Sequence, residues 1–245
     1  SGLTTGRLHL VEAQVAVQRG RFDAALVAID ASLTAFESVR DRRGMANAQL
    51  IAAAIMLALD APADATELAT QAHATYVAID APARAAAALT LLARVAQAGG
   101  DAGTAITQSM QAAALYRAQD VPWRALDASL VAVALGDRDA AATLQAALGE
   151  PELPTALRAR AQLALADAAL ARGDVARARS RLTALGSIVL DPLQAHHRTL
   201  IETALYIREG KPARAIADLD AAIERVHRLA GVLPSASLRF ALGAQ

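Results

Sequence analysis

The sequence predicts an all-α protein built as an array of repeats, and three observations lead to this prediction. Of the 245 residues, 55% are hydrophobic but only 3% are aromatic, and much of the apolar content is alanine, the strongest helix former. No stretch alternates with the period of two that a half-buried strand requires. A turn followed by a helix start recurs every 36 to 40 residues. We therefore expect pairs of helices that pack by close backbone approach.

Each recurring turn is anchored by a glycine or, in one case, an aspartate. We expect the anchor to end the first helix of a pair, because glycine readily adopts the left-handed conformation found at helix C-termini. Successive anchors are 40, 40, 36, 37 and 37 residues apart. The anchors are Gly20, Asp60, Gly100, Gly136, Gly173 and Gly210.

Small residues flank every anchor at fixed distances. An alanine follows each anchor by five residues: Ala25, Ala65, Ala105, Ala141, Ala178 and Ala215. A small residue precedes each anchor by seven: Ala13, Ala53, Ala93, Ser129, Ala166 and Thr203. We expect these two sets to face each other across each pair of helices. Three aromatic residues spaced 40 apart are expected to fill the gap to the next pair: Phe36, Tyr76 and Tyr116.

Six stacked pairs are expected to form one continuous core, because no single pair buries its apolar face alone. The array takes up residues 1–232, with pairs near 7–41, 42–81, 82–120, 121–153, 154–191 and 192–232. Pro234 and Ser235 then predict another helix start. Residues 233–245 would begin either a linker or a helix that caps the last pair.

With its small residue, its turn glycine and the alanine five residues later, the unit resembles the tetratricopeptide repeat (TPR) from about Arg7 to Val232. The resemblance implies a right-handed α-solenoid of about six TPR-like helix pairs, which binds a protein or peptide in its concave groove. The chain departs from the family pattern, because the Trp-x-x-Leu-Gly opening is missing and the units exceed the usual length of about 34 residues. The longer period is more similar to the TPRs of large bacterial regulators and sensors.

The run from Ala222 to Gln245 resembles the segment that joins a TPR array to a CHAT domain, a caspase-like bacterial protease with a His/Cys catalytic pair. The matching residues are Leu233, Pro234, Ser235, Leu238, Arg239 and Phe240. The resemblance implies that the chain is the sensor or regulatory part of a CHAT-type protease whose catalytic domain is not in this chain, so the chain itself is not an enzyme. The alternatives are the TPR arm of a bacterial transcription regulator and a stand-alone adaptor or scaffold.

Charge and cysteine content narrow the range of partners. The chain has 24 basic and 24 acidic residues, and its formal net charge of zero argues against nucleic acid. Since cysteine is absent, we expect no disulfide and no thiolate zinc site. The longest uncharged run, Gly44–Leu59, is too short to span a membrane, and the N-terminus does not resemble a signal peptide. We therefore expect a cytoplasmic protein with no membrane contact.

No pattern of residues predicts a catalytic set, a cofactor or a metal site. His196 and His197 are adjacent, so on a helix they point about 100° apart and cannot chelate one ion together. Four arginines cluster around the fifth turn: Arg172, Arg177, Arg179 and Arg181. Arg177 and Arg181 share a helix face, which either holds an acidic partner segment or is a solvated surface.

A partner-binding groove is expected on the first helices of the pairs, as in TPR arrays. Positions thirteen and six residues before each anchor share one face of these helices, and their mixed side chains suit a peptide better than a small apolar ligand. Trp123 is the only tryptophan and serves either as a packing anchor or as an interface hot spot. The predicted contact residues are Arg94, Trp123, Arg160, Asp167 and His197.

Overall fold

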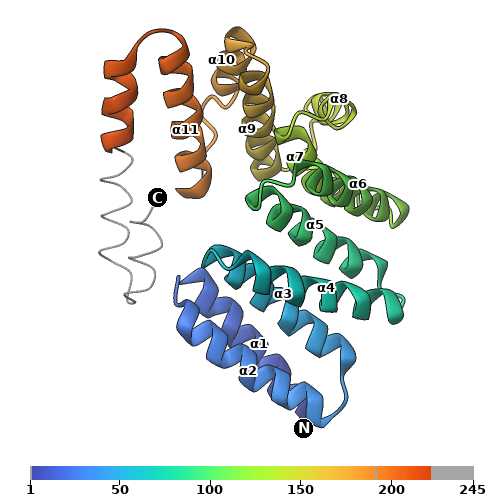
Figure 1. The fold of residues 1–245 in the computed structure, drawn as a ribbon. Helices are drawn as coiled ribbons and strands as arrows, with labels where there is room; N and C mark the ends of the chain where they lie inside the picture. The colour runs from blue at the N-terminus through green and yellow to red at the C-terminus, as the bar shows by residue number, and fades with distance from the viewer. Residues whose placement is uncertain (1, 191, 222–245) are drawn as a thin grey trace. The chain divides into compact units, whose positions relative to one another are not determined.

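The computed structural model describes residues 2–190 and 192–221 (Figure 1). All regular secondary structure in these ranges is helical, which confirms the all-α class. The chain divides into two compact units, one within residues 1–108 and one within residues 109–226. Among the described residues, no helix is both long and apolar enough to cross a membrane.

Six helices of equal length occupy the chain as far as Ala118. Each has 17 residues, and three-residue turns connect them. They are α1 (Gly2–Gln18), α2 (Phe22–Ser38), α3 (Arg42–Ala58), α4 (Pro62–Ala78), α5 (Pro82–Ala98) and α6 (Ala102–Ala118). The boundary between the two units falls within α6.

The helices after α6 vary in length. They are α7 (Pro122–Ala134), α8 (Arg138–Ala147), α9 (Thr155–Ala171), α10 (Val175–Thr183) and α11 (Pro192–Arg208), followed by helical residues 212–221. The remainder of the sixth expected pair and the helix start predicted at Pro234 lie outside the described residues.

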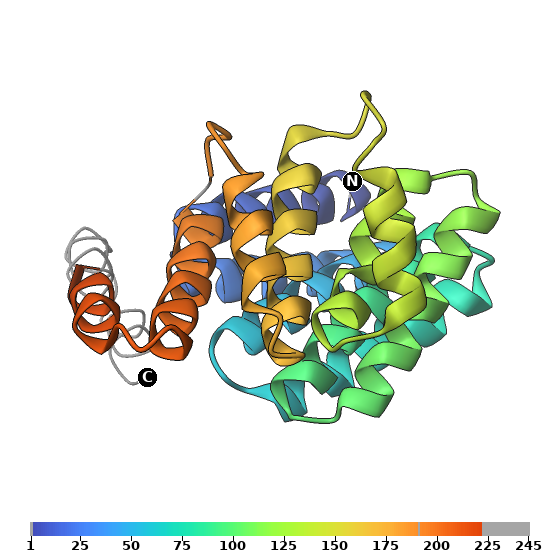
Figure 2. The same cartoon turned by 90° about the horizontal axis from the view of Figure 1, so that it is seen from above.

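The first helices of successive pairs pack against one another within each unit. In the first unit α1 contacts α3 and α3 contacts α5. In the second unit α7 contacts α9 and α9 contacts α11 (Figures 1 and 2). This packing is consistent with an α-solenoid, and the right-handed sense and the number of repeats stay predictions.

The predicted anchors all adopt the left-handed backbone conformation, with φ between 58° at Asp60 and 93° at Gly136. In the first turn, the N–H of Arg21 donates to the carbonyl of Ala16 over 2.9 Å. This bond is typical of a Schellman turn, which satisfies carbonyls at the end of a helix. The turns after α2, α4 and α6 use the same conformation without glycine, at Arg40, Asp80 and Asp120.

The small residues beside the anchors are buried, as expected for close helix contacts, with one exception. Ala141 is only half-buried, and Ala140 is 1% exposed in its place. One turn later Leu144 is buried and Gln145 is exposed. The prediction for Ala141 was wrong. A rotation of α8 about its own axis by one residue position buries the side chain of Leu144 instead of that of Gln145. This removes more apolar surface from water than burying Gln145 would.

Phe36 fills the gap between the first pair and α3, as predicted. Its ring lies so close to two glycines that a Cβ atom on Gly6 would approach it to 2.7 Å, and one on Gly44 would come closer still. Only glycine therefore fits at these positions without a shift of the ring.

Forty residues later, the hydroxyl of Tyr76 donates to Oδ1 of Asn47 over 2.8 Å, and burial raises the pKa of Tyr76 to about 12.

Candidate partner-binding surfaces

The predicted contact residues fall in both units. Arg94 is exposed on α5 in the first unit, and the structure gives it no defined position relative to the other four. Trp123 lies on α7, Arg160 and Asp167 on α9, and His197 on α11, all in the second unit and all half-buried. Three of these four residues take part in ion pairs between neighbouring first helices.

Arg160 on α9 forms an ion pair with Asp127 on α7. Asp127 follows Trp123 by four residues, so the two share one face of α7. The Oδ1 atom of Asp127 is buried and accepts no hydrogen bond among the described residues, so the guanidinium of Arg160 compensates its charge. Asp127 was not predicted from the sequence, although its spacing of four residues from Trp123 could have indicated it.

His197 on α11 pairs with Asp167 on α9, with 2.6 Å between Nε2 and Oδ2. The hydrogen bond to Asp167 raises the pKa of His197; burial opposes this shift, and the charge of Asp167 adds to it. The geometry therefore favours a charged imidazolium that links the two helices. Both residues were predicted for the groove, but their contact was not predicted.

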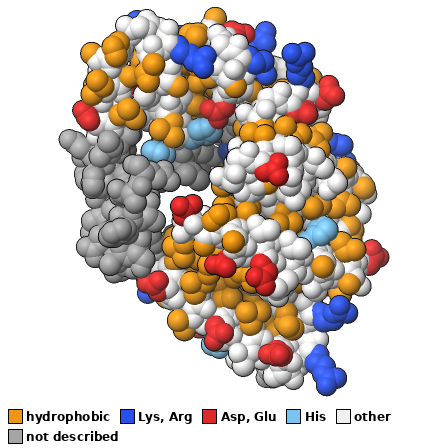
Figure 3. All heavy atoms as spheres, viewed as in Figure 1, with side chains coloured by type: hydrophobic (Ala, Val, Ile, Leu, Met, Phe, Trp, Pro, Cys, Tyr) orange, Lys and Arg blue, Asp and Glu red, His pale blue; other side chains and the backbone are white. Residues whose placement is uncertain are grey.

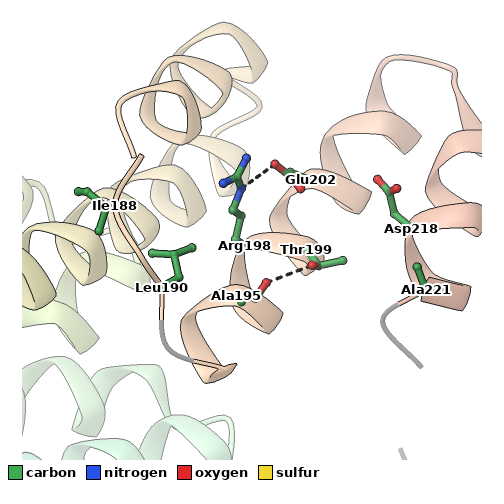
Figure 4. A pocket seen from close by; sticks show the side chains of 8 residues that line it. All are labelled: Ile188, Leu190, Ala195, Arg198, Thr199, Glu202, Asp218 and Ala221. Carbon is green, nitrogen blue, oxygen red and sulfur yellow. Dashed lines mark hydrogen bonds and ion pairs between the residues drawn. The ribbon is translucent and has the colours of Figure 1, made fainter. Parts of the chain in front are cut away.

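A second polar cluster lines a pocket of about 440 Å³ beside α11 (Figure 4). Nε of Arg198 donates to Oε1 of Glu202 over 2.8 Å, and Asp218 projects from the facing helical segment. Within residues 2–190 and 192–221, no group of three or more His, Cys, Asp or Glu could hold a metal ion.

Arginines from α8, from α10 and from the turn between α9 and α10 line another pocket, of about 560 Å³, which we call the arginine pocket. Figure 3 shows Lys and Arg side chains along the part of the surface that α8 and α10 form. The lining residues are Arg138, Ala141, Ala142 and Gln145 of α8, Leu165 and Arg172 at α9, and Arg177 and Arg181 of α10.

The predicted arginine cluster is thus split between two surfaces. Arg172, Arg177 and Arg181 line the arginine pocket. Arg179 instead pairs with Glu209, and its guanidinium lies 5.6 Å from the centre of the Tyr206 ring. Arg138 was not predicted from the sequence; it follows Gly136, the anchor of the preceding pair, by two residues.

A comparison with protein-family models finds no match to this chain, and a comparison with curated proteins finds none either. The TPR and CHAT resemblances therefore stay predictions, and any function must be argued from the surfaces described above.

Proposed function

We propose that the chain is a protein–protein interaction module, and that a partner binds the shared face of α7, α9 and α11. The observation that carries this proposal is the series of cross-helix ion pairs, Asp127–Arg160 and Asp167–His197, beside the half-buried Trp123. We call these five residues the first-helix surface.

The ion pairs support binding because they fix long side chains before a partner arrives. Ordering a flexible side chain at an interface opposes binding by about 0.5–1.5 kcal/mol, and a side chain that is already held avoids much of this loss. Tryptophan and arginine are also the residue types that most often dominate the energy of an interface. Trp123 and Arg160 are therefore the expected hot spots.

A sharper form of the proposal is that the module is the sensor part of a CHAT-type protease. It rests on the resemblance of residues 233–240, which lie outside the described residues. In this form, a bound partner favours one arrangement of the stacked helices over another and so biases a catalytic domain beyond Gln245. An intact cellular protein well above 25.3 kDa, with a His/Cys-bearing domain after Gln245, is the expected result. A helix-turn-helix or P-loop domain at that place would favour a transcription regulator.

Site-specific photo-crosslinking in the source cell tests the interaction module itself. A crosslinker at position 123 should capture a discrete protein, and the Arg160→Ala change should reduce that capture. Position 27 is the matched control, because Val27 is 72% exposed on α2 in the first unit and should capture nothing discrete. Equal capture at both positions, or capture unaffected by Arg160→Ala, would contradict the proposal.

A further inference from the structure

We propose that the arginine pocket binds an acidic peptide segment of a partner protein in an extended conformation. This inference rests on the proposed function, since it assumes that the chain binds proteins, and it assigns a second surface and the chemistry of the segment that this surface takes.

The charge of the pocket is strongly one-sided. Four arginines line it, and none of the lining residues is acidic. Among the lining arginines, Arg177 forms a long ion pair with Asp174, with 3.5 Å between Nε of Arg177 and Oδ2 of Asp174. Asp174 also caps α10, because its Oδ1 accepts the backbone N–H of Arg177 over 2.9 Å. The lining itself, with four arginines and no acidic residue, is therefore positively charged.

Arg181 lies deepest among the four arginines and is held by neutral groups. Its guanidinium donates to the side-chain oxygens of Gln145 and Gln162. Burial, followed by the charge of Arg177, lowers the pKa of Arg181. Amide oxygens orient the guanidinium without neutralising it, so an incoming carboxylate would gain a charge-assisted and bidentate contact.

The fold does not need these arginines, because the same groove recurs elsewhere with other side chains. A pocket of about 320 Å³ in the first unit lies among α4, α5 and α6. Counted from the anchors, the positions of Arg138, Arg172, Arg177 and Arg181 correspond there to Pro62, Gly99, Thr104 and Gln108.

The equivalent positions of α2, α3 and α4 offer a third comparison. There, the positions that match Arg138, Arg172 and Arg181 are Phe22, Leu59 and Leu68, which pack on an apolar cluster. The equivalent positions therefore carry apolar side chains in one place, with Asp64 at the position of Arg177, and small or neutral ones in the other. Placing arginine at all four positions adds like-charge repulsion that a purely structural role would avoid.

The spacing of the arginines suits an extended chain. Arg177 and Arg181 are one helical turn apart, which is about 5–6 Å. Alternate side chains of an extended peptide project on the same side about 7 Å apart. Two acidic residues separated by one residue can therefore reach both guanidinium groups. The apolar side chains of Ala141, Ala142 and Leu165 offer a surface for the intervening residues.

Fluorescence anisotropy with a labelled peptide of about ten residues, alternating Glu and Ala, tests the pocket directly. The intact chain should bind this peptide and should not bind its Gln–Ala counterpart. The changes Arg177→Gln/Arg181→Gln and Arg138→Gln/Arg172→Gln should each weaken binding at least about tenfold, because each removes two charge-assisted contacts. Added salt should weaken binding to the intact chain.

The matched control removes the same charge elsewhere. Arg42 and Arg43 are exposed on α3, and Arg42→Gln/Arg43→Gln should leave the affinity within about twofold, since these residues are far from the pocket in sequence and belong to the other unit. Circular dichroism of every variant establishes that helicity is retained. Equal weakening by the control pair and the pocket pairs would overturn the proposal, because it would show only a general effect of net charge.

A transplant provides the reciprocal test. Thr104→Arg/Gln108→Arg in the first unit recreates the spacing of Arg177 and Arg181 without partners at the positions of Arg138 and Arg172, so it should create a second peptide site that is at least about tenfold weaker and is filled at higher peptide concentration. Asp101 precedes Thr104 by three residues, as Asp174 precedes Arg177, so the local acidic residue is matched as well. A stoichiometry that rises from one peptide to two per chain is the expected result, and an unchanged stoichiometry would count against the proposed geometry.

Two further outcomes separate this inference from the proposed function. If inorganic phosphate binds the pocket and the Glu–Ala peptide does not, the inference fails, whereas crosslinking at position 123 is unaffected. If crosslinking at position 123 fails but the peptide binds as described, the first-helix surface is wrong and the arginine pocket stands.

Discussion

The first six helices and the helices after them differ in the lengths of the helices and of the connections between pairs. From α1 to α6 every helix has 17 residues and every turn has three, whether the turn lies within a pair or between pairs. After α6, the turns within pairs keep three residues, but longer connections follow α8 and α10. Three-residue turns are thus kept wherever the two helices of a pair meet, and variation in the length of the connections is confined to the junctions between pairs.

The contacts between helices differ in the same way. In the first unit, Phe36 seals a junction against two glycines, and the hydroxyl of Ser32 donates to the carbonyl of Gly6 over 2.8 Å. In the second unit, charged pairs such as Asp127–Arg160 and Asp167–His197 link neighbouring first helices. Apolar junctions contribute mainly to stability, whereas half-exposed ion pairs contribute little to it and instead hold polar side chains in place at the surface. The comparison supports placing the binding surfaces in the second unit.

Removing the aromatic ring of Phe36 should have the largest effect on stability. Phe36→Ala leaves a cavity beside Gly6 and Gly44, and the free energy of unfolding should fall by about 3–5 kcal/mol. Chemical denaturation monitored by circular dichroism measures this change. Val27→Ala on the exposed side of α2 is the control and should stay within about 0.5 kcal/mol.

The double variant Phe36→Ala/Gly44→Ala sharpens this test. Gly44→Ala alone should destabilise by about 1–3 kcal/mol, because its Cβ meets the ring. Once the ring is gone, the added methyl group fills space, so the double variant should be more stable than the sum of the two single changes implies. Additive effects would show that Phe36 does not pack on Gly44.

Leu144→Ala tests whether α8 is rolled relative to the register of the other second helices. Because Leu144 is fully buried, this change should cost about 2–5 kcal/mol, whereas Gln145→Ala should stay within about 0.5 kcal/mol. Thermal or urea unfolding of both variants provides the measurement. The reverse order would restore the register that the sequence predicted, with Ala141 facing inward.

Two substitutions in the turns should change the free energy of unfolding by smaller amounts and in opposite directions. At Gly136, with φ at 93°, nothing lies within 4 Å of an added Cβ, so Gly136→Ala should destabilise by about 1 kcal/mol through backbone strain alone. At Asp60, with φ at 58°, Asp60→Gly relieves a similar strain but raises the conformational entropy of the unfolded chain. We therefore expect the free energy of unfolding to rise by no more than about 1 kcal/mol. Thermal melting compares the two, and a shift of the same sign in both would contradict the shared turn conformation.

The repeat explains how much of the fold the sequence could predict. An anchor residue with alanine five positions later is a local signal, so the six turns within pairs were found from it. The left-handed turns at Arg40, Asp80 and Asp120 carry no glycine and gave no such signal. The rotation of α8 about its axis was not predicted. It depends on which of two adjacent residues, Leu144 or Gln145, lies in apolar surroundings, and only the packed structure shows this.

The candidate sites were predicted less completely, for a related reason. Arg177 and Arg181 lie one turn apart on a single helix, so their shared face could be read from spacing. Arg138 reaches the same pocket from α8, a different helix, and only the superposition of successive repeats brings it there. The pairing of Asp167 with His197 likewise needs the stacking of α9 on α11.

Breaking the ion pair between Asp167 and His197 should cause the smallest loss of stability, and the pH dependence of this loss identifies the pair as its source. Asp167 raises the pKa of His197 above its ordinary value of 6.5, so the pair stabilises the folded state fully below about pH 6.5 and loses this contribution as pH rises through the raised pKa. Asp167→Asn should therefore destabilise by no more than about 1 kcal/mol near pH 5.5, because the pair is partly exposed, and by progressively less at alkaline pH. NMR titration of the His197 ring should show its pKa falling in the variant. In a His197→Gln background, Asp167→Asn should lose this pH dependence, and a dependence that persisted there would assign the effect to another group.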